Sequence, residues 1–184
     1  RAAFEVLNSG SEFTLTGGTF DIERGVTGDA NESLELDPTT YDLTGSTITL
    51  FQSLGSNYGA NFFNIKSSIP LNDLSIQGSV DLPDARIYVQ PLTVNNLTIN
   101  TNQVLDANNL DLTENGDFAN TGTYTNTASN TIFGGSGAQE ISGAGTYTIY
   151  DLTKNGAGTT NSTVDLVLGN DLRINSGTFN IGAN

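Results

Sequence analysis

The sequence has no Cys, His, Met or Trp, and these absences remove whole classes of chemistry. Without Cys there is neither a disulfide framework nor a thiolate metal site. Without His and Cys, the usual nucleophile–base triads and zinc sites cannot be built. We therefore predict no catalytic residue and no required cofactor. A chain that begins with Arg1 and lacks Met is expected to be a segment of a longer protein.

Positive charge is also scarce. Six Lys and Arg stand against 20 Asp and Glu, which gives a formal net charge of −14. A surface this acidic repels phosphate, so nucleic acid and anionic lipid are not expected partners. No apolar run approaches the roughly 20 residues of a membrane helix, so direct membrane insertion is not expected either. Cations and neutral glycans remain as ligands.

Hydrophobic residues are few and are spread evenly along the chain. They make up 36% of the sequence, with 14% charged residues against about 25% in ordinary globular domains. Apolar and polar residues alternate, and Thr and Asn are abundant beside 21 Gly. Thr suits strands, whereas Asn and Gly suit tight turns. This composition predicts an all-β protein with many short strands and no helix.

A ten-residue unit opens and closes the segment. Residues 13–22 (FTLTGGTFDI) and 172–181 (LRINSGTFNI) share the pattern apolar-x-apolar-x-x-Gly-Thr-Phe-x-Ile. A variant appears at residues 41–50, and another at residues 110–118. Each unit is expected to form a strand, a Gly-containing corner and a second strand, with alternate side chains pointing inward.

The repeats predict a parallel β-solenoid, in which successive turns of chain stack along one axis. The segment GTYT at residues 122–125 returns at residues 145–148, 23 positions later. A period in the low twenties gives roughly eight or nine coils, in one continuous domain over residues 1–184. Coil boundaries within residues 23–70 stay open. Four residues are expected in the core: Phe20, Phe118, Phe133 and Phe179.

One stretch resembles a known group of proteins. Residues 133–143 (FGGSGAQEISG) are followed by residues 150–155 (YDLTKN) and then by residues 172–179 (LRINSGTF). These motifs resemble the repeat regions of large type IX-secreted surface proteins of Bacteroidota, including gliding-motility adhesins. The resemblance is clear over residues 116–181, whereas the N-terminal half lacks a Gln-x-Ile-x-Gly element. It implies a right-handed β-solenoid, export by the type IX pathway and a place on the cell surface.

An acidic loop is the candidate calcium site. Asp29, Asn31 and Ser33 repeat the first three ligand spacings of an EF-hand loop, and Glu32 lies among them. Leu34 occupies the sixth position, where that loop needs Gly, and Thr40 occupies the twelfth, where it needs Glu. A solvated acidic loop is the simpler interpretation, with calcium at Asp29, Asn31 and Glu32 as the alternative.

Tyrosines are the candidate glycan contacts. Tyr88, Tyr147 and Tyr150 could stack on sugar rings if they are exposed. Tyr147 and Ile149 share one strand phase, while Tyr150 and Leu152 share the other. A bulge or corner must separate the two pairs if both point inward; otherwise one Tyr is exposed.

Together these features predict a non-catalytic structural segment of an extracellular bacterial surface fibre or adhesin stalk. Its expected partners are further coils or domains of the same polypeptide, copies of itself in an oligomer or filament, and glycan surfaces. The first alternative is a carbohydrate-binding β-helix module. The second is a polysaccharide-cleaving β-helix enzyme, which needs two carboxylates held roughly 5–10 Å apart.

Overall fold

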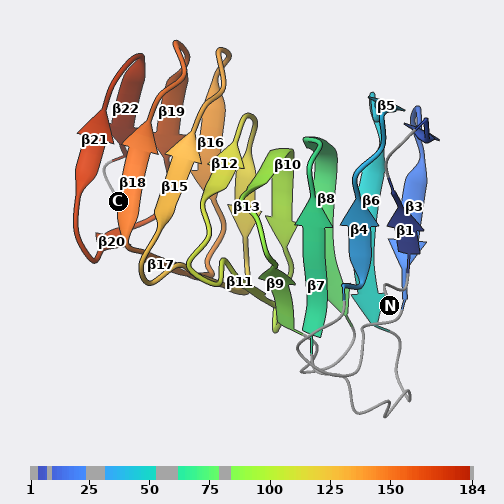
Figure 1. The fold of residues 1–184 in the computed structure, drawn as a ribbon. Coiled ribbons are helices and arrows are strands. Elements are labelled where there is room, and N and C mark those ends of the chain that lie inside the picture. The colour runs from blue at the N-terminus through green and yellow to red at the C-terminus, as the bar shows by residue number, and fades with distance from the viewer. Residues whose placement is uncertain (1–3, 8–9, 24–31, 53–61, 79–83, 183–184) are drawn as a thin grey trace.

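The computed structural model describes residues 4–7, 10–23, 32–52, 62–78 and 84–182. Every regular element in these ranges is a β-strand, so they hold no helix that could cross a membrane. The strands stack in chain order along one axis, from the N-terminal coil to the C-terminal coil (Figure 1). The predicted all-β, parallel β-solenoid is confirmed.

One strand from each successive coil enters an eight-stranded sheet, and every pairing in it is parallel. Its members are β1 (Phe4–Val6), β4 (Leu34–Leu36), β7 (Phe62–Ser67), β9 (Asp84–Ile87), β11 (Val104–Asp106), β14 (Thr123–Thr125), β17 (Thr146–Ile149) and β20 (Val167–Leu168).

A twelve-stranded parallel sheet faces this one. Its N-terminal members are β3 (Thr19–Ile22), β6 (Thr47–Gln52), β8 (Leu71–Gly78) and β10 (Leu92–Ile99). Beyond β10 the sheet continues in two rows. The first row holds β12 (Leu112–Glu114), β15 (Asn130–Phe133), β18 (Asp151–Lys154) and β21 (Leu172–Ile174). The second row holds β13 (Phe118–Asn120), β16 (Gln139–Ser142), β19 (Thr159–Ser162) and β22 (Thr178–Ile181). A small third sheet pairs β2 (Glu12–Thr14) with β5 (Thr40–Asp42).

The twelve-stranded sheet divides at β10. The first part of β10 pairs with β12, and the second part pairs with β13. Asn95 and Asn96 lie between the two parts, opposite the turn that contains Gly116. From this coil onward, a glycine corner replaces the middle of each long strand, as it does between β2 and β3 and between β5 and β6 in the first two coils.

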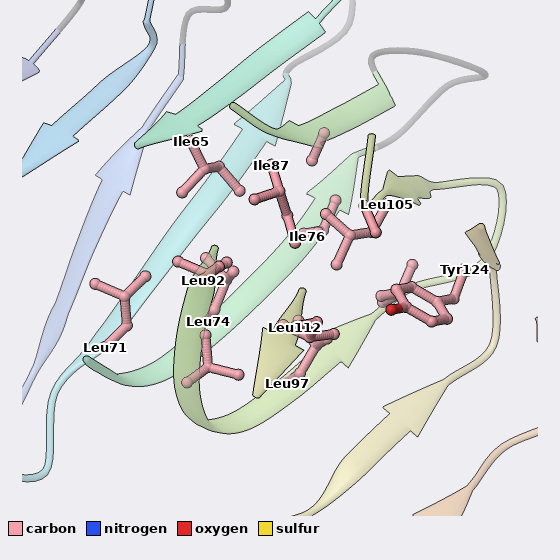
Figure 2. Packing of buried hydrophobic residues seen from close by; sticks show 14 of the residues in the cluster. Ile65, Leu71, Leu74, Ile76, Ile87, Leu92, Leu97, Leu105, Leu112 and Tyr124 are labelled. Carbon is pink, nitrogen blue, oxygen red and sulfur yellow. The ribbon is translucent and has the colours of Figure 1, made fainter. Parts of the chain in front are cut away.

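Side-chain columns run through the interior, because stacked strands place equivalent residues above one another. In one column, Leu74 lies beside Leu97, Leu97 beside Phe118, and Phe118 beside Ile141. All four are at most 1% exposed. Figure 2 shows aliphatic side chains from both large sheets meeting in this narrow core. Each fully buried aliphatic or phenyl group contributes about 1.5–3 kcal/mol.

The ten-residue unit has the predicted form. β2 and β3 flank the corner in its first copy, and β21 and β22 flank it in the last. Gly18 and Gly177 take φ values of 76° and 74° at these corners. This left-handed backbone region is open to Gly without steric cost. Phe118 and Phe133 are fully buried, and Phe20 and Phe179 pack partly buried against the core, as predicted.

Coil length differs between the two halves. The two GTYT segments stack directly, with Tyr124 beside Tyr147, 23 positions later. In the N-terminal half the coils are longer, since Phe4 pairs with Leu34 and Leu34 with Ile65. The longer coils are confined to the first part of the chain, because Phe63 pairs with Ala85, 22 positions later, and Leu74 with Leu97, 23 positions later. The right-handed winding stays a prediction.

Candidate functional site

Polar side chains form a ladder on the outer face of the twelve-stranded sheet. Asn96 donates to Asp73 at 2.7 Å, and its own Oδ1 accepts the N–H of Asp117 at 2.8 Å. Asp117 in turn accepts the N–H of Glu140 at 2.8 Å. We call the set the outer ladder; its members are Asp73, Asn96, Asp117, Glu140, Asn161 and Asn180. Every member except Glu140 binds a neighbouring coil through its side chain, which favours a structural role.

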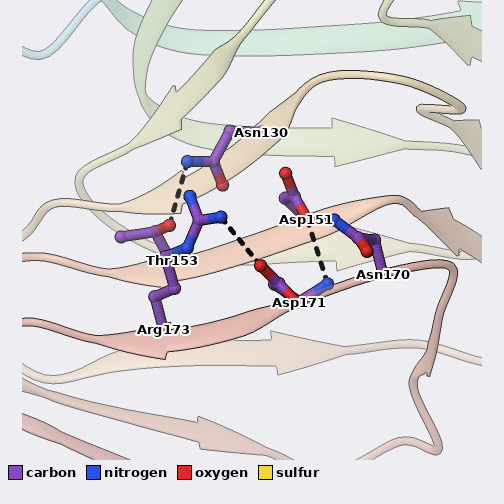
Figure 3. A network of polar contacts seen from close by, with 6 residues as sticks. All are labelled: Asn130, Asp151, Thr153, Asn170, Asp171 and Arg173. Atoms are coloured by element: carbon purple, nitrogen blue, oxygen red, sulfur yellow. Dashed lines mark hydrogen bonds and ion pairs between the residues drawn. The ribbon is translucent and has the colours of Figure 1, made fainter.

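A second ladder follows the other row of the same sheet (Figure 3). Asp171 donates its N–H to the Asp151 carboxylate at 3.0 Å, and Asn170 donates its side-chain amide to it at 2.8 Å. Arg173 forms an exposed ion pair with Asp171 at 2.8 Å. The Asp171 N–H, followed by the Asn170 amide, lowers the pKa of Asp151. Asp151 therefore stays ionised and keeps two coils in register.

In the described residues, no group of three or more carboxylates is placed to hold a metal ion. Of the calcium candidates, Asp29 and Asn31 lie outside the described residues, and Glu32 is half-buried just before β4. Within β4 itself, Glu35 forms an ion pair with Lys66 of the neighbouring strand β7 at 2.5 Å.

Tyr147 and Tyr150 line one hollow of about 250 Å³, together with Thr127, Thr148 and Val167. A corner lies at Tyr150, between β17 and β18, and allows both Ile149 and Leu152 to point inward. The sequence had left two alternatives open: a bulge or corner between the two residue pairs, or one exposed Tyr.

The two tyrosines differ in exposure. Tyr147 is only 7% exposed, and its hydroxyl donates to the Ser142 carbonyl at 2.5 Å. Its ring meets Phe118 edge-on, with centroids 5.2 Å apart. Burial raises the pKa of Tyr147 well above its usual range. Tyr147 is thus a core residue, whereas Tyr150 is half-buried and lines the hollow.

Tyr88 lies three coils before this hollow, so the structure does not bring the three tyrosines together. It is half-buried at the end of β9, and its N–H donates to the Ile65 carbonyl at 2.8 Å. The next residue, Val89, has a φ of 70°, which β-branched residues rarely adopt. Gln90 donates its N–H to the Tyr88 carbonyl at 2.9 Å, which closes a γ-turn.

A polar cluster inside the C-terminal half was missed by sequence reasoning. We call it the inner cluster; it consists of Glu114, Gln139, Lys154 and Thr160, none more than 1% exposed. Glu114, Phe133 and Lys154 occupy one interior column in consecutive coils. Strand alternation could have revealed it, because Leu112 and Leu152 share their inward phase with Glu114 and Lys154.

The two charged members of the inner cluster lack an ion-pair partner in the described part of the chain. Neither carboxyl oxygen of Glu114 has a hydrogen-bond partner there. Burial, followed by the charge of Asp117, raises the pKa of Glu114 well above its usual range. Burial also lowers the pKa of Lys154. Both shifts favour neutral side chains, since an isolated buried charge is costly.

The C-terminal coil exposes apolar side chains that are buried in earlier coils. Leu172 stacks on Leu152, yet it is 45% exposed while Leu152 is 1% exposed. Ile174 and Ile181, which continue two other interior columns, are 52% and 69% exposed. Within the described ranges, β20, β21 and β22 each pair with a strand on one side only.

Comparison with protein-family models, with curated proteins and with solved structures gave no match to this chain.

Proposed function

We propose that this chain is a non-catalytic structural segment of an extracellular bacterial surface fibre or adhesin stalk. The observation that carries the proposal is the unbroken stacking of parallel strands from β3 to β22 around sealed side-chain columns. A solenoid of this kind makes a rod that needs no disulfide. The likeness of residues 116–181 to type IX-secreted repeat regions supports a place on the cell surface.

Further solenoid coils are the partner that we propose for the C-terminal coil. Leu172, Ile174 and Ile181 continue the interior columns, and the free edges of β21 and β22 can accept parallel strands. Unpaired edges with apolar side chains favour association with such strands.

Location and particle shape together test the fibre proposal. Antibodies against the purified chain should label threads on intact cells of the parent organism in electron micrographs.

Sedimentation should show an elongated particle that associates as its concentration rises. A double variant, Ile174→Lys with Ile181→Lys, should stay monomeric, whereas Val167→Lys on the lateral face should behave like the wild type. Label confined to the cell interior, or a compact particle, would contradict the proposal.

A carbohydrate-binding module is the second candidate, because of the hollow beside Tyr150. The absence of a Cβ at Gly169 allows close packing of the Tyr150 ring, whose Cδ2 would lie 3.1 Å from such an atom. Val167 adds an apolar wall that is 76% exposed, and Thr148 adds a hydroxyl. A half-buried tyrosine beside hydroxyls suits weak stacking on a neutral sugar.

Glycan binding can be measured directly. If the hollow binds sugar, binding to immobilised neutral glycans should fall about tenfold or more in Tyr150→Ala and stay unchanged in Tyr41→Ala. Tyr41 is a suitable control because it is exposed and lies far from the hollow, in β5. Equal binding by both variants would remove Tyr150 as the contact.

The enzyme alternative has one feature in its favour, which is the adjacency of Asp117 and Glu140 in neighbouring coils. Both acids are exposed on the outer ladder, and Asp117 is already bound to the Glu140 N–H. If these acids cleave glycans, the purified chain should release new reducing ends from polysaccharides, and Asp117→Asn should abolish that release. Our proposal expects no release from the wild type.

A further inference from the structure

The Lys154 amine lies inside the solenoid with only carbonyl oxygens around its nitrogen. Its Nζ is 3.3 Å from each of three atoms: the Phe133 carbonyl oxygen, the Gly135 carbonyl oxygen and Oε1 of Gln139. The side chain is 0% exposed and has no carboxylate partner among the described residues. Transfer of an unpaired ammonium from water to such a place is costly, so the neutral amine is favoured.

A neutral amine is a nucleophile with two N–H donors and one lone pair. The ammonium form donates to all three oxygens. The neutral amine can keep the main-chain carbonyls of Phe133 and Gly135 as acceptors, give up the bond to Oε1 of Gln139 and turn its lone pair toward Cδ of that carboxamide. Desolvation, which lowers the pKa of Lys154, adds to the fraction of this reactive form.

The Gln139 carboxamide is fixed on all sides. Its Nε2 donates to the main-chain oxygens of Glu114 and Gly116, each at 3.0 Å. Its Oε1 accepts the Thr160 hydroxyl at 3.1 Å, beside the Lys154 contact. A hydrogen bond from Thr160 to this oxygen polarises the carbonyl and would stabilise negative charge formed on it. The carboxamide is 1% exposed as part of Gln139, so water does not compete for its carbon.

We propose that Lys154 and Gln139 form an intramolecular isopeptide bond, which joins β18 to β16 of the preceding coil. In the reaction, Nζ of Lys154 attacks Cδ of Gln139 and forms a C–N bond. The Cδ–Nε2 bond then breaks, and a proton from Nζ moves to Nε2, which leaves as ammonia. No oxidant, reductant or further reactant is required. The fixed geometry accelerates the reaction, because it holds the amine beside the carboxamide and so converts a slow bimolecular aminolysis into a reaction within one site.

The bond would tie two coils together covalently at a place where hydrogen bonds now connect them. It does not depend on the fibre role, since any function of the solenoid would leave the inner cluster in place. Failure of the bond would therefore leave the proposed function untouched, and failure of the fibre role would leave the bond untouched.

Mass spectrometry of the purified, folded wild-type chain tests the proposal. The intact mass should be lower than the sequence mass by one ammonia, and digestion should release a branched peptide that contains both Lys154 and Gln139. Asn115 and Asn155 each precede a Gly and can also lose ammonia by cyclisation, so the branched peptide is the decisive product.

Two variants serve as controls. Lys154→Arg removes the nucleophile, and Gln139→Met removes the carboxamide at similar volume; neither should yield a branched peptide. On a denaturing gel the linked wild type should migrate faster than either variant, because residues 139–154 stay closed as a loop. The proposal is overturned if aged, folded wild-type protein yields only linear peptides that carry unmodified Lys154 and Gln139. That result needs no variant to fold.

Discussion

At the residue scale, the interior is less uniform than the hydrophobic columns suggest. Tyr124 is fully buried, and its hydroxyl lies 2.8 Å from Thr131 Oγ1, with Asn126 nearby. Its ring meets Phe118 edge-on at 5.2 Å. Aromatic rings of this kind fill the core where no aliphatic group is large enough, but they require a partner for the polar atom. Burial of ionisable groups such as Tyr124 and Glu114 shifts their pKa values, so the stability of the C-terminal half is expected to depend on pH.

The first prediction concerns Tyr124. Burial raises its pKa to about 12 from 10.0, so its stabilising contribution is present below 10.0 and is lost as pH rises through about 12. Unfolding titrations should show wild-type stability falling in this alkaline window. Tyr124→Phe should flatten the fall and cost about 1 kcal/mol at neutral pH, because Thr131 loses one of its two hydrogen-bond partners. Tyr41→Phe, at an exposed site, is the control and should match the wild type.

The second prediction concerns Glu114, whose pKa burial raises well above 4.5. The protonated form is favoured in the folded state, so its contribution is complete below 4.5 and is lost as pH rises through the folded pKa. Glu114→Gln should therefore be more stable than the wild type at neutral pH, and the difference should shrink in acid. Chemical denaturation at both conditions measures this. Glu140→Gln, on the outer ladder, should show no comparable gain; equal gains in both variants would contradict the explanation.

At the element scale, the corners determine the path of the chain more than the strands do. A long strand such as β8 and a pair of short strands such as β12 and β13 bury the same kind of inward residue. What separates them is the glycine turn between Glu114 and Phe118. Because coils stack about 4.8 Å apart, a corner residue meets the carbonyl groups of the previous coil, and a Cβ is often too large there.

The third prediction compares two corner glycines in consecutive coils. A Cβ at Gly158 would overlap the main-chain carbonyl of Gly137, whereas a Cβ at Gly137 would have nothing within 4 Å. Gly158→Ala should lose about 1–3 kcal/mol of unfolding free energy through this overlap. Gly137→Ala should stay within about 0.5 kcal/mol of the wild type. Thermal and chemical unfolding would measure both, and a neutral Gly158→Ala would show that the corner can move aside.

At the scale of the whole molecule, stability should vary along the axis. Each coil contacts only its neighbours, so central coils are supported on two sides and the last described coil on one. In β10, Leu97 is 0% exposed, while in β22 Ile181 is 69% exposed. The rod is therefore expected to open from its C-terminal coil inward.

Hydrogen exchange measured by mass spectrometry checks the fourth prediction. Amides of β20, β21 and β22 should exchange at least about tenfold faster than those of β10 under native conditions, because their opening costs less free energy. Equal protection along the axis would indicate that the coils unfold as one unit. The Ile174→Lys and Ile181→Lys changes should leave exchange in β10 unchanged.

The sequence by itself determined the repeating pattern of strands and corners in this protein. Alternation from Leu97 to Ile99, the Gly-Thr-Phe corners and the two GTYT segments are local patterns, and each stacked as predicted because strand phase fixes which side chains point inward. These patterns also predicted the core position of Phe118 and the all-β character that the described residues show.

Only the tertiary structure decided what depends on residues distant in sequence. The division of β10 requires two later strands to share one partner, and the inner cluster requires Gln139 to meet carbonyls from an earlier coil. The burial of Tyr147 and the partial exposure of Tyr150 depend on a corner whose position the pattern left open. Local alternation specifies a face for each side chain. The neighbours of a side chain on that face belong to other coils, so they are determined only when the coils stack.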